Sequence, residues 1–96
     1  MNITKGVISR DEAVELAPAY VKFCENEDSD FFTMFNAFNR LKRNQRVLTY
    51  VDGKFVIAKV TKVDKNSYQA VDGPVIRVSN GEYSWRCDGS GYAAPI

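Results

Sequence analysis

Apolar and polar residues alternate along residues 46–87, and this alternation predicts a run of short antiparallel strands. Two segments, 46–51 and 54–63, are rich in β-branched and aromatic residues, which suit a pleated surface. Between them stands Asp52-Gly53, a pair that favours a two-residue type I′ turn because both positions need positive φ. The pattern therefore predicts a β-hairpin.

The register of this hairpin follows from the turn. A two-residue loop places Tyr50 opposite Phe55 and Leu48 opposite Ile57. Because side chains alternate between the two faces of a strand, these four apolar residues share one face. The other face is also largely apolar and carries Val47, Thr49, Val51, Val56, Ala58 and Val60. We therefore expect this hairpin to be partly covered on both sides.

A second hairpin is predicted at Asn80-Gly81, with Val78 opposite Tyr83 and Ile76 opposite Trp85. Those four apolar residues fall on one face. The opposite face is polar and collects Arg77, Ser79, Glu82 and Ser84. This is the pattern of an antiparallel sheet with one buried and one solvated face.

The segment between the two hairpins predicts a polar loop at 64–67, a short strand at 68–71 and a turn at Asp72-Gly73-Pro74. The whole is a five-stranded antiparallel meander, either a curled sheet or a small, partly open barrel. In strand length and turn spacing this half of the chain resembles small SH3-like barrels. The glycine-rich residues 88–96 are expected to form a flexible tail.

Residues 1–45 predict a helical cover for the sheet. Ser9-Arg10-Asp11-Glu12 forms a capping box that begins a first helix, and Pro18 kinks that helix or starts a new turn. A second helix is predicted from Asp30 to about Arg43. Its apolar stripe follows helical spacing and consists of Phe31, Met34, Phe35, Phe38 and Leu41. We expect one α+β domain, 1–96, in which two N-terminal helices pack on the sheet.

Composition points away from catalysis. The chain has no histidine, which removes the commonest general base and the commonest metal ligand at neutral pH. It carries no motif of a hydrolase, a nucleotide-binding loop or a zinc site. We expect no enzymatic activity, no metal and no cofactor. No apolar run could span a bilayer and no signal peptide is evident, so the expected location is the cytoplasm, with two reduced cysteines.

Charge is unevenly distributed along the chain. Residues 11–30 hold seven acids against one lysine, a balance of −6, and residues 40–65 hold eight bases against two acids, a balance of +6. The net charge of +1 conceals this separation. Basic residues near a helix C-terminus, or lysines that discourage strand pairing, would account for part of the basic segment. A binding patch is the other interpretation, and the sequence leaves both open.

The favoured hypothesis is a small protein-binding module that docks on a larger partner and modulates or inhibits it. The chain resembles, in its size and lack of enzyme motifs, bacteriophage accessory proteins that inhibit a host factor. The candidate partner-binding residues are Arg40, Lys42, Arg43, Arg46, Tyr50, Lys54 and Lys59. The alternative is a nucleic-acid-binding protein that places the basic segment 40–65 on phosphates. Two copies could also pair through their opposite charges.

Overall fold

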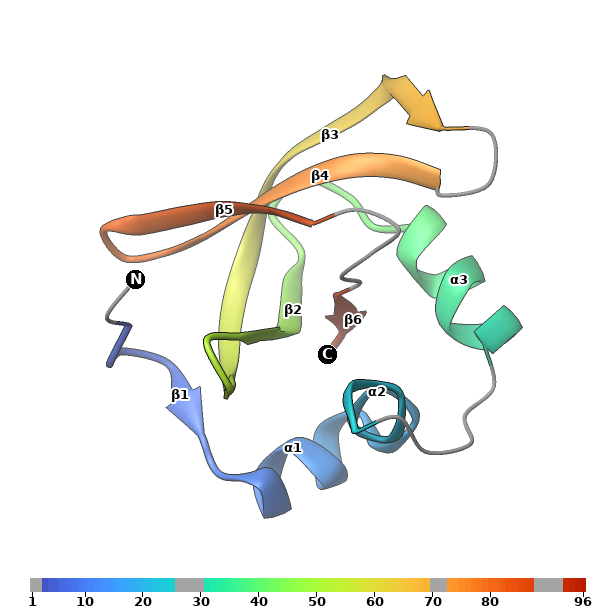
Figure 1. The fold of residues 1–96 in the computed structure, drawn as a ribbon. Helices are drawn as coiled ribbons and strands as arrows, with labels where there is room; N and C mark the ends of the chain where they lie inside the picture. The colour runs from blue at the N-terminus through green and yellow to red at the C-terminus, as the bar shows by residue number, and fades with distance from the viewer. Residues whose placement is uncertain (1–2, 26–30, 70–72, 88–92) are drawn as a thin grey trace.

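The computed structural model describes residues 3–25, 31–69, 73–87 and 93–96 (Figure 1). Within these ranges three helices lie along one side of a curled antiparallel sheet, so the α+β class is confirmed. The helices are α1 (Arg10–Leu16), α2 (Pro18–Cys24) and α3 (Phe31–Asn39). The strands are β1 (Val7–Ile8), β2 (Arg46–Val51), β3 (Lys54–Gln69), β4 (Gly73–Asn80), β5 (Tyr83–Cys87) and β6 (Ala94–Pro95).

The strand order is β5-β4-β3-β2-β6, with β1 pairing β3 beside this path. The sheet therefore has six antiparallel strands within the described residues, not the five of the predicted meander. The two unpredicted strands, β1 and β6, each contain two residues and come from segments expected to be a lead-in and a flexible tail. Residues 88–92 of that tail lie outside the described part of the chain.

The first hairpin has the predicted register. Tyr50 pairs with Phe55 and Leu48 with Ile57, and Asp52 and Gly53 have φ of 53° and 76°. Positive φ at both central positions is the type I′ turn that this pair favours. The neighbours Val47 and Leu48 point to opposite faces and are both fully buried, so β2 is covered on both sides.

The second hairpin pairs differently from the prediction. Val78 lies opposite Trp85, not Tyr83, because the turn consists of Gly81 and Glu82 and leaves Asn80 in β4. Asn80 is buried, and its Nδ2 donates a hydrogen bond to the Ile57 carbonyl at 2.8 Å. That bond gives the amide a role inside the sheet, so Asn80 is unavailable as a turn residue. The shift moves each partner by two positions, and the apolar and polar faces are those predicted.

The predicted loop at 64–67 is wrong, because β3 runs without interruption for 16 residues, from Lys54 to Gln69. Polar composition marked this stretch as a loop, but its backbone belongs to the sheet. The pairing with β4 shifts twice, between Val60 and Lys62 and between Asp64 and Gln69. Of the predicted turn Asp72-Gly73-Pro74, Asp72 lies outside the described residues, and Gly73 and Pro74 belong to β4.

The helical half contains three helices where two were predicted. Ser9 caps α1 as expected, and its Oγ accepts a hydrogen bond from the Glu12 N–H at 3.2 Å. Pro18 does not kink this helix; it occupies the first turn of α2, where its missing N–H costs nothing. The helix α3 ends at Asn39, four residues before the predicted end. The next amide, that of Arg40, bonds three residues back to the Ala37 carbonyl, which tightens and closes the helix.

The apolar stripe of α3 faces the core as predicted. Met34, Phe38 and Leu41 are buried, and Phe35 packs against the same cluster; the side chain of Phe31 is not described. The sheet residues of this core include Val47, Leu48, Val60, Ile76 and Val78. Helices and sheet therefore share one hydrophobic core.

Candidate binding surface

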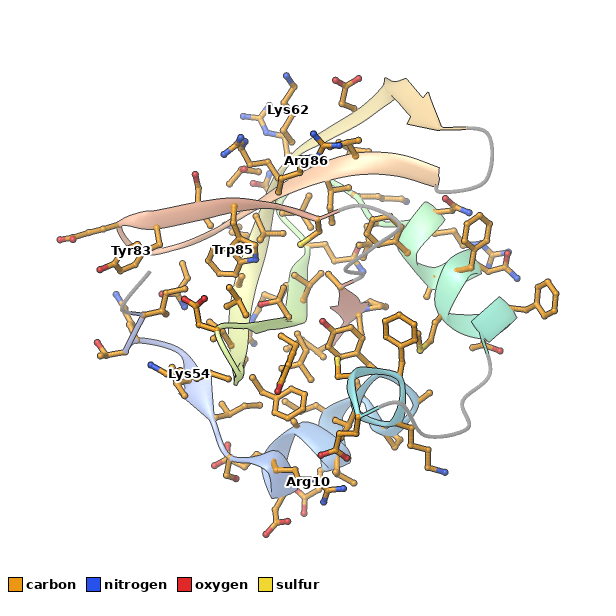
Figure 2. All side chains as sticks on the ribbon, viewed as in Figure 1. Arg10, Lys54, Lys62, Tyr83, Trp85 and Arg86 are labelled. Atoms are coloured by element: carbon orange, nitrogen blue, oxygen red, sulfur yellow. The ribbon has the colours of Figure 1, made fainter. Side chains whose placement is uncertain are left out.

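Three cationic side chains lie side by side across three strands. Lys62 of β3 pairs with Arg77 of β4, which pairs with Arg86 of β5. All three are exposed. Neighbouring strands are about 4.8 Å apart, so the row places three positive charges within about 10 Å of backbone. Figure 2 shows Lys62 and Arg86 on the side of the sheet that points away from the helices, with Trp85 on the other side.

A β-bulge at Thr61 builds this row. Val60 pairs with Val78, but the next pair is Lys62 with Arg77, so Thr61 is an extra residue in β3. Its Oγ1 donates a hydrogen bond to the Arg77 carbonyl at 3.1 Å, which fixes the bulge against β4. If Thr61 instead paired regularly with Arg77, Lys62 would lie opposite the fully buried Ile76 and point into the core. Bulges commonly redirect a side chain in this way.

A second row continues the same outer surface toward β2. Arg46 pairs with Lys59, and Lys59 pairs with Ser79 of β4. Both cations are exposed. We call the two rows together the basic face; it consists of Arg46, Lys59, Lys62, Arg77 and Arg86. Like charges directly opposite each other destabilise a sheet, so folding alone does not favour this arrangement.

The surface is hollowed within the basic face. A depression of about 230 Å³ is lined by Lys62, Asp64, Val75, Ile76, Arg77 and Arg86. The Arg77 guanidinium is held over β5 because its Nη1 donates a hydrogen bond to the Ser84 Oγ at 3.3 Å. The lining thus contains three cations and one carboxylate beside a partly apolar wall. Such a depression suits an anionic group.

Three of the sequence-predicted residues, Arg40, Lys42 and Arg43, lie exposed in the loop that joins α3 to β2. The loop is tied to β3, because the Asn44 N–H donates to the Val60 carbonyl at 2.7 Å and the Val60 N–H donates to the Gln45 carbonyl at 2.9 Å. It leads directly into Arg46, so these three cations lie in the loop next to the β2 end of the basic face.

Tyr50 and Lys54 lie at the other end of the first hairpin. Tyr50 is 45% exposed, and its ring packs on Phe55 with centroids 4.9 Å apart. Lys54 is partly buried and donates a hydrogen bond from Nζ to the Ile3 carbonyl at 3.2 Å. Its ammonium therefore fastens the N-terminal segment to the hairpin, and it stands apart from the basic face.

The candidate residues missed Lys62, Arg77 and Arg86, of which only Lys62 lies in the predicted basic segment 40–65. Alternation had already placed Arg77 on the polar face of the second hairpin. Its pairing with Lys62 could not be foreseen, because it depends on the bulge at Thr61 and on contact between strands distant in sequence. A basic segment consists of residues close in sequence, whereas these cations are close only in space.

The acidic part of the chain lies on the helices, away from the basic face. Asp11, Glu12 and Glu15 of α1 are exposed. Glu25 receives two hydrogen bonds from the Arg10 guanidinium, 2.7 Å from Nε and 2.8 Å from Nη2. These bonds lower the pKa of the Glu25 carboxyl below its ordinary value. Residues 26–30, which carry the remaining predicted acids, lie outside the described residues.

This pairing can be measured directly. Replacing Arg10 with Gln should raise the pKa of the Glu25 carboxyl toward its ordinary value. An NMR pH titration that monitors the side-chain carboxyl carbon measures this pKa in both proteins. A folded-state pKa below the unfolded value means that the pair stabilises the fold above that unfolded value. The contribution disappears as pH falls through the folded-state pKa. An identical titration midpoint in both proteins would show that the ion pair does not form in solution.

Tyr20 and Cys24 have shifted pKa values that packing within the fold explains. Burial is the main cause that raises the pKa of Tyr20 well above its ordinary value, and it also raises the pKa of the Cys24 thiol. Both groups therefore stay protonated near neutral pH. Cys24 and Cys87 are free thiols. Among the residues that the structure describes, no group of three His, Cys, Asp or Glu side chains could hold a metal ion. Nor does any helix in these ranges have the length and apolarity to cross a membrane.

No protein-family model, curated protein or solved structure matches the chain.

Proposed function

We propose that this protein is a non-catalytic module that docks on a partner protein through its basic face and modulates or inhibits that partner. The observation that carries the proposal is the row formed by Lys62, Arg77 and Arg86, three exposed cations on adjacent strands. A partner with an acidic surface offsets the repulsion between them. Complementary charges of this kind increase the association rate and select the partner.

Affinity requires apolar contact beside the charges, and Tyr50 supplies an exposed ring. Tyr50 lies four residues along β2 from Arg46, so the two side chains point to the same side of the strand. At about 3.3 Å per residue the two are roughly 13 Å apart, well within one protein interface. Leu48, which points to the same side of β2 between them, is fully buried, so a partner on the basic face contacts Tyr50 only by extending past this covered stretch of the strand.

Charge reversal tests the proposal. The double variant Lys62→Glu/Arg77→Glu, used as bait in extracts of the native host, should lose the partners that the unchanged protein captures. We expect a loss of at least tenfold in captured partner, since each close charge pair at an interface contributes at least about 1.5 kcal/mol. Both side chains are exposed, so the fold should persist.

The matched control is Lys5→Glu/Lys22→Glu, which changes the net charge equally at two exposed positions outside the basic face. It should retain the captured partners. Equal capture by both double variants would contradict the proposal, because the basic face would then contribute no more than any other cation.

Binding to nucleic acid is the second candidate, favoured by the continuity of the basic face with the loop cations Arg40, Lys42 and Arg43. It predicts that nuclease treatment abolishes capture, and that affinity for an oligonucleotide falls steeply as salt rises. A protein interface with an apolar centre weakens much less over the same range. These two measurements separate the candidates.

A further inference from the structure

We infer that the hollow of the basic face is a phosphoryl pocket, which accepts a phosphorylated side chain of the protein partner. The pocket is the depression lined by Lys62, Arg77 and Arg86 together with Asp64, Val75 and Ile76. This inference rests on the proposed function, since it names the group by which the partner would be recognised.

The charge of the lining matches a phosphoryl group. Three cations and the carboxylate of Asp64 leave a formal charge of +2 around the hollow. A phosphorylated serine or threonine carries a charge of about −1.5 to −2 at pH 7, which balances this lining. A single aspartate or glutamate of the partner carries −1 and leaves half of the charge uncompensated.

The donors have the chemistry that phosphate recognition uses. Guanidinium groups donate charge-assisted hydrogen bonds to phosphoryl oxygens, and a lysine adds a point charge. Arg77 is already oriented by its hydrogen bond to the Ser84 Oγ. Because one donor is held before the ligand arrives, less side-chain freedom is lost on binding.

The shape of the pocket concentrates these charges. Val75, which points to the same side of β4 as Arg77, is partly buried and adds an apolar wall to the hollow, whereas the side chain of Ile76 points to the opposite, buried side of the strand. Electrostatic attraction is stronger beside low-dielectric groups than in open water. The bulge at Thr61 completes the arrangement, because it turns Lys62 onto the rim rather than into the core.

An NMR titration at constant ionic strength tests the pocket. The probes are inorganic phosphate and N-acetyl-phosphoserine amide, and the readouts are the backbone amides of Lys62, Arg77 and Arg86 and the Nε–H groups of both arginines. We expect saturable shifts at these positions. Arg77→Gln should weaken binding by at least about tenfold, since charge-assisted hydrogen bonds contribute about 1.5–3 kcal/mol. Lys62→Gln provides a second variant, and Lys22→Gln is the matched control that should bind unchanged.

Three kinds of result would overturn the inference. One is a chemical-shift change with phosphate that is no larger than the change with chloride, or a phosphate response that both pocket variants retain. Another is binding of N-acetyl-glutamate amide as tight as that of the phosphoserine probe, which would make the hollow a carboxylate site. Tighter binding of an oligonucleotide lacking terminal phosphates would likewise replace the phosphorylated side chain with a nucleic-acid backbone.

Phosphatase treatment of the host extract separates this inference from the proposed function. If treatment abolishes capture and charge reversal also does, both stand. If charge reversal abolishes capture but phosphatase does not, docking through the basic face stands and the phosphoryl pocket is overturned. If the pocket variants lose phosphate while charge reversal leaves capture intact, the pocket binds phosphate but the proposed docking surface fails, and with it the phosphorylated partner.

Discussion

Phe38→Ala should lower the free energy of unfolding by about 3–5 kcal/mol, the range for emptying a buried aromatic site. Among the side chains that the structure describes, Phe38 is the largest that is fully buried, with no exposed surface, and it joins α3 to the sheet core. Its removal takes apolar surface out of the core and leaves a cavity that the neighbouring β-strands cannot readily close. Chemical denaturation followed by circular dichroism measures the loss.

Phe32→Ala in the same helix is the matched control. Phe32 is 76% exposed, so its replacement should change stability by less than about 1 kcal/mol. Since both variants remove the same side chain from α3, the difference between them isolates burial from helix propensity. Equal losses would show that the α3 stripe does not pack as the structure has it.

Elements specified by neighbouring residues were predictable from the sequence. The first hairpin has its predicted register because the turn chemistry of Asp52-Gly53 and the alternation of its flanks agree. The Ser9 cap and the inward stripe of α3 follow from equally local rules. Even the second hairpin kept its predicted faces. Its turn moved by one residue because the buried Asn80 amide bonds to β3, a contact between residues 23 apart.

Elements specified by distant contacts were not predictable. Residues 64–67 look like a loop because they are polar, yet they extend β3 beside β4. The two-residue strands β1 and β6 are too short to leave a pattern and exist because β3 and β2 offer them free edges. Such strands are fixed by the edge that receives them rather than by their own propensity.

The candidate site also has one part that the local sequence predicts and another that depends on contacts between distant residues. The pairing of Arg46 with Lys59 follows from the predicted register of the first hairpin, and both were among the predicted residues. The hollow depends on Arg77 and Arg86, which the sheet brings to Lys62 only through the bulge. A charge count along the chain finds a basic segment, whereas the basic face is a property of strand order. It therefore includes cations from four strands.

Gly6→Ala is the second large effect that we expect, a loss of about 2–5 kcal/mol in the free energy of unfolding. Gly6 has φ of 75°, which an L-residue adopts at a cost of roughly 1–2 kcal/mol. A methyl group there would lie 2.9 Å from the Ile57 carbonyl oxygen and would collide with the Asn80 side-chain amide. Displacing that amide breaks its bond to Ile57, and a buried group left unpaired costs about 1–3 kcal/mol more.

Gly53→Ala separates the two causes. Gly53 has nearly the same φ, 76°, but a methyl group there meets nothing within 4 Å. It should therefore show only the conformational cost, and the excess loss in Gly6→Ala measures the contact with Asn80 and β3. The double variant Gly6→Ala/Asn80→Ala should lose less stability than the sum of its single variants, because both remove the same hydrogen bond. Strictly additive losses, measured by denaturant unfolding, would show that Gly6 and Asn80 do not form the junction between β1, β3 and β4.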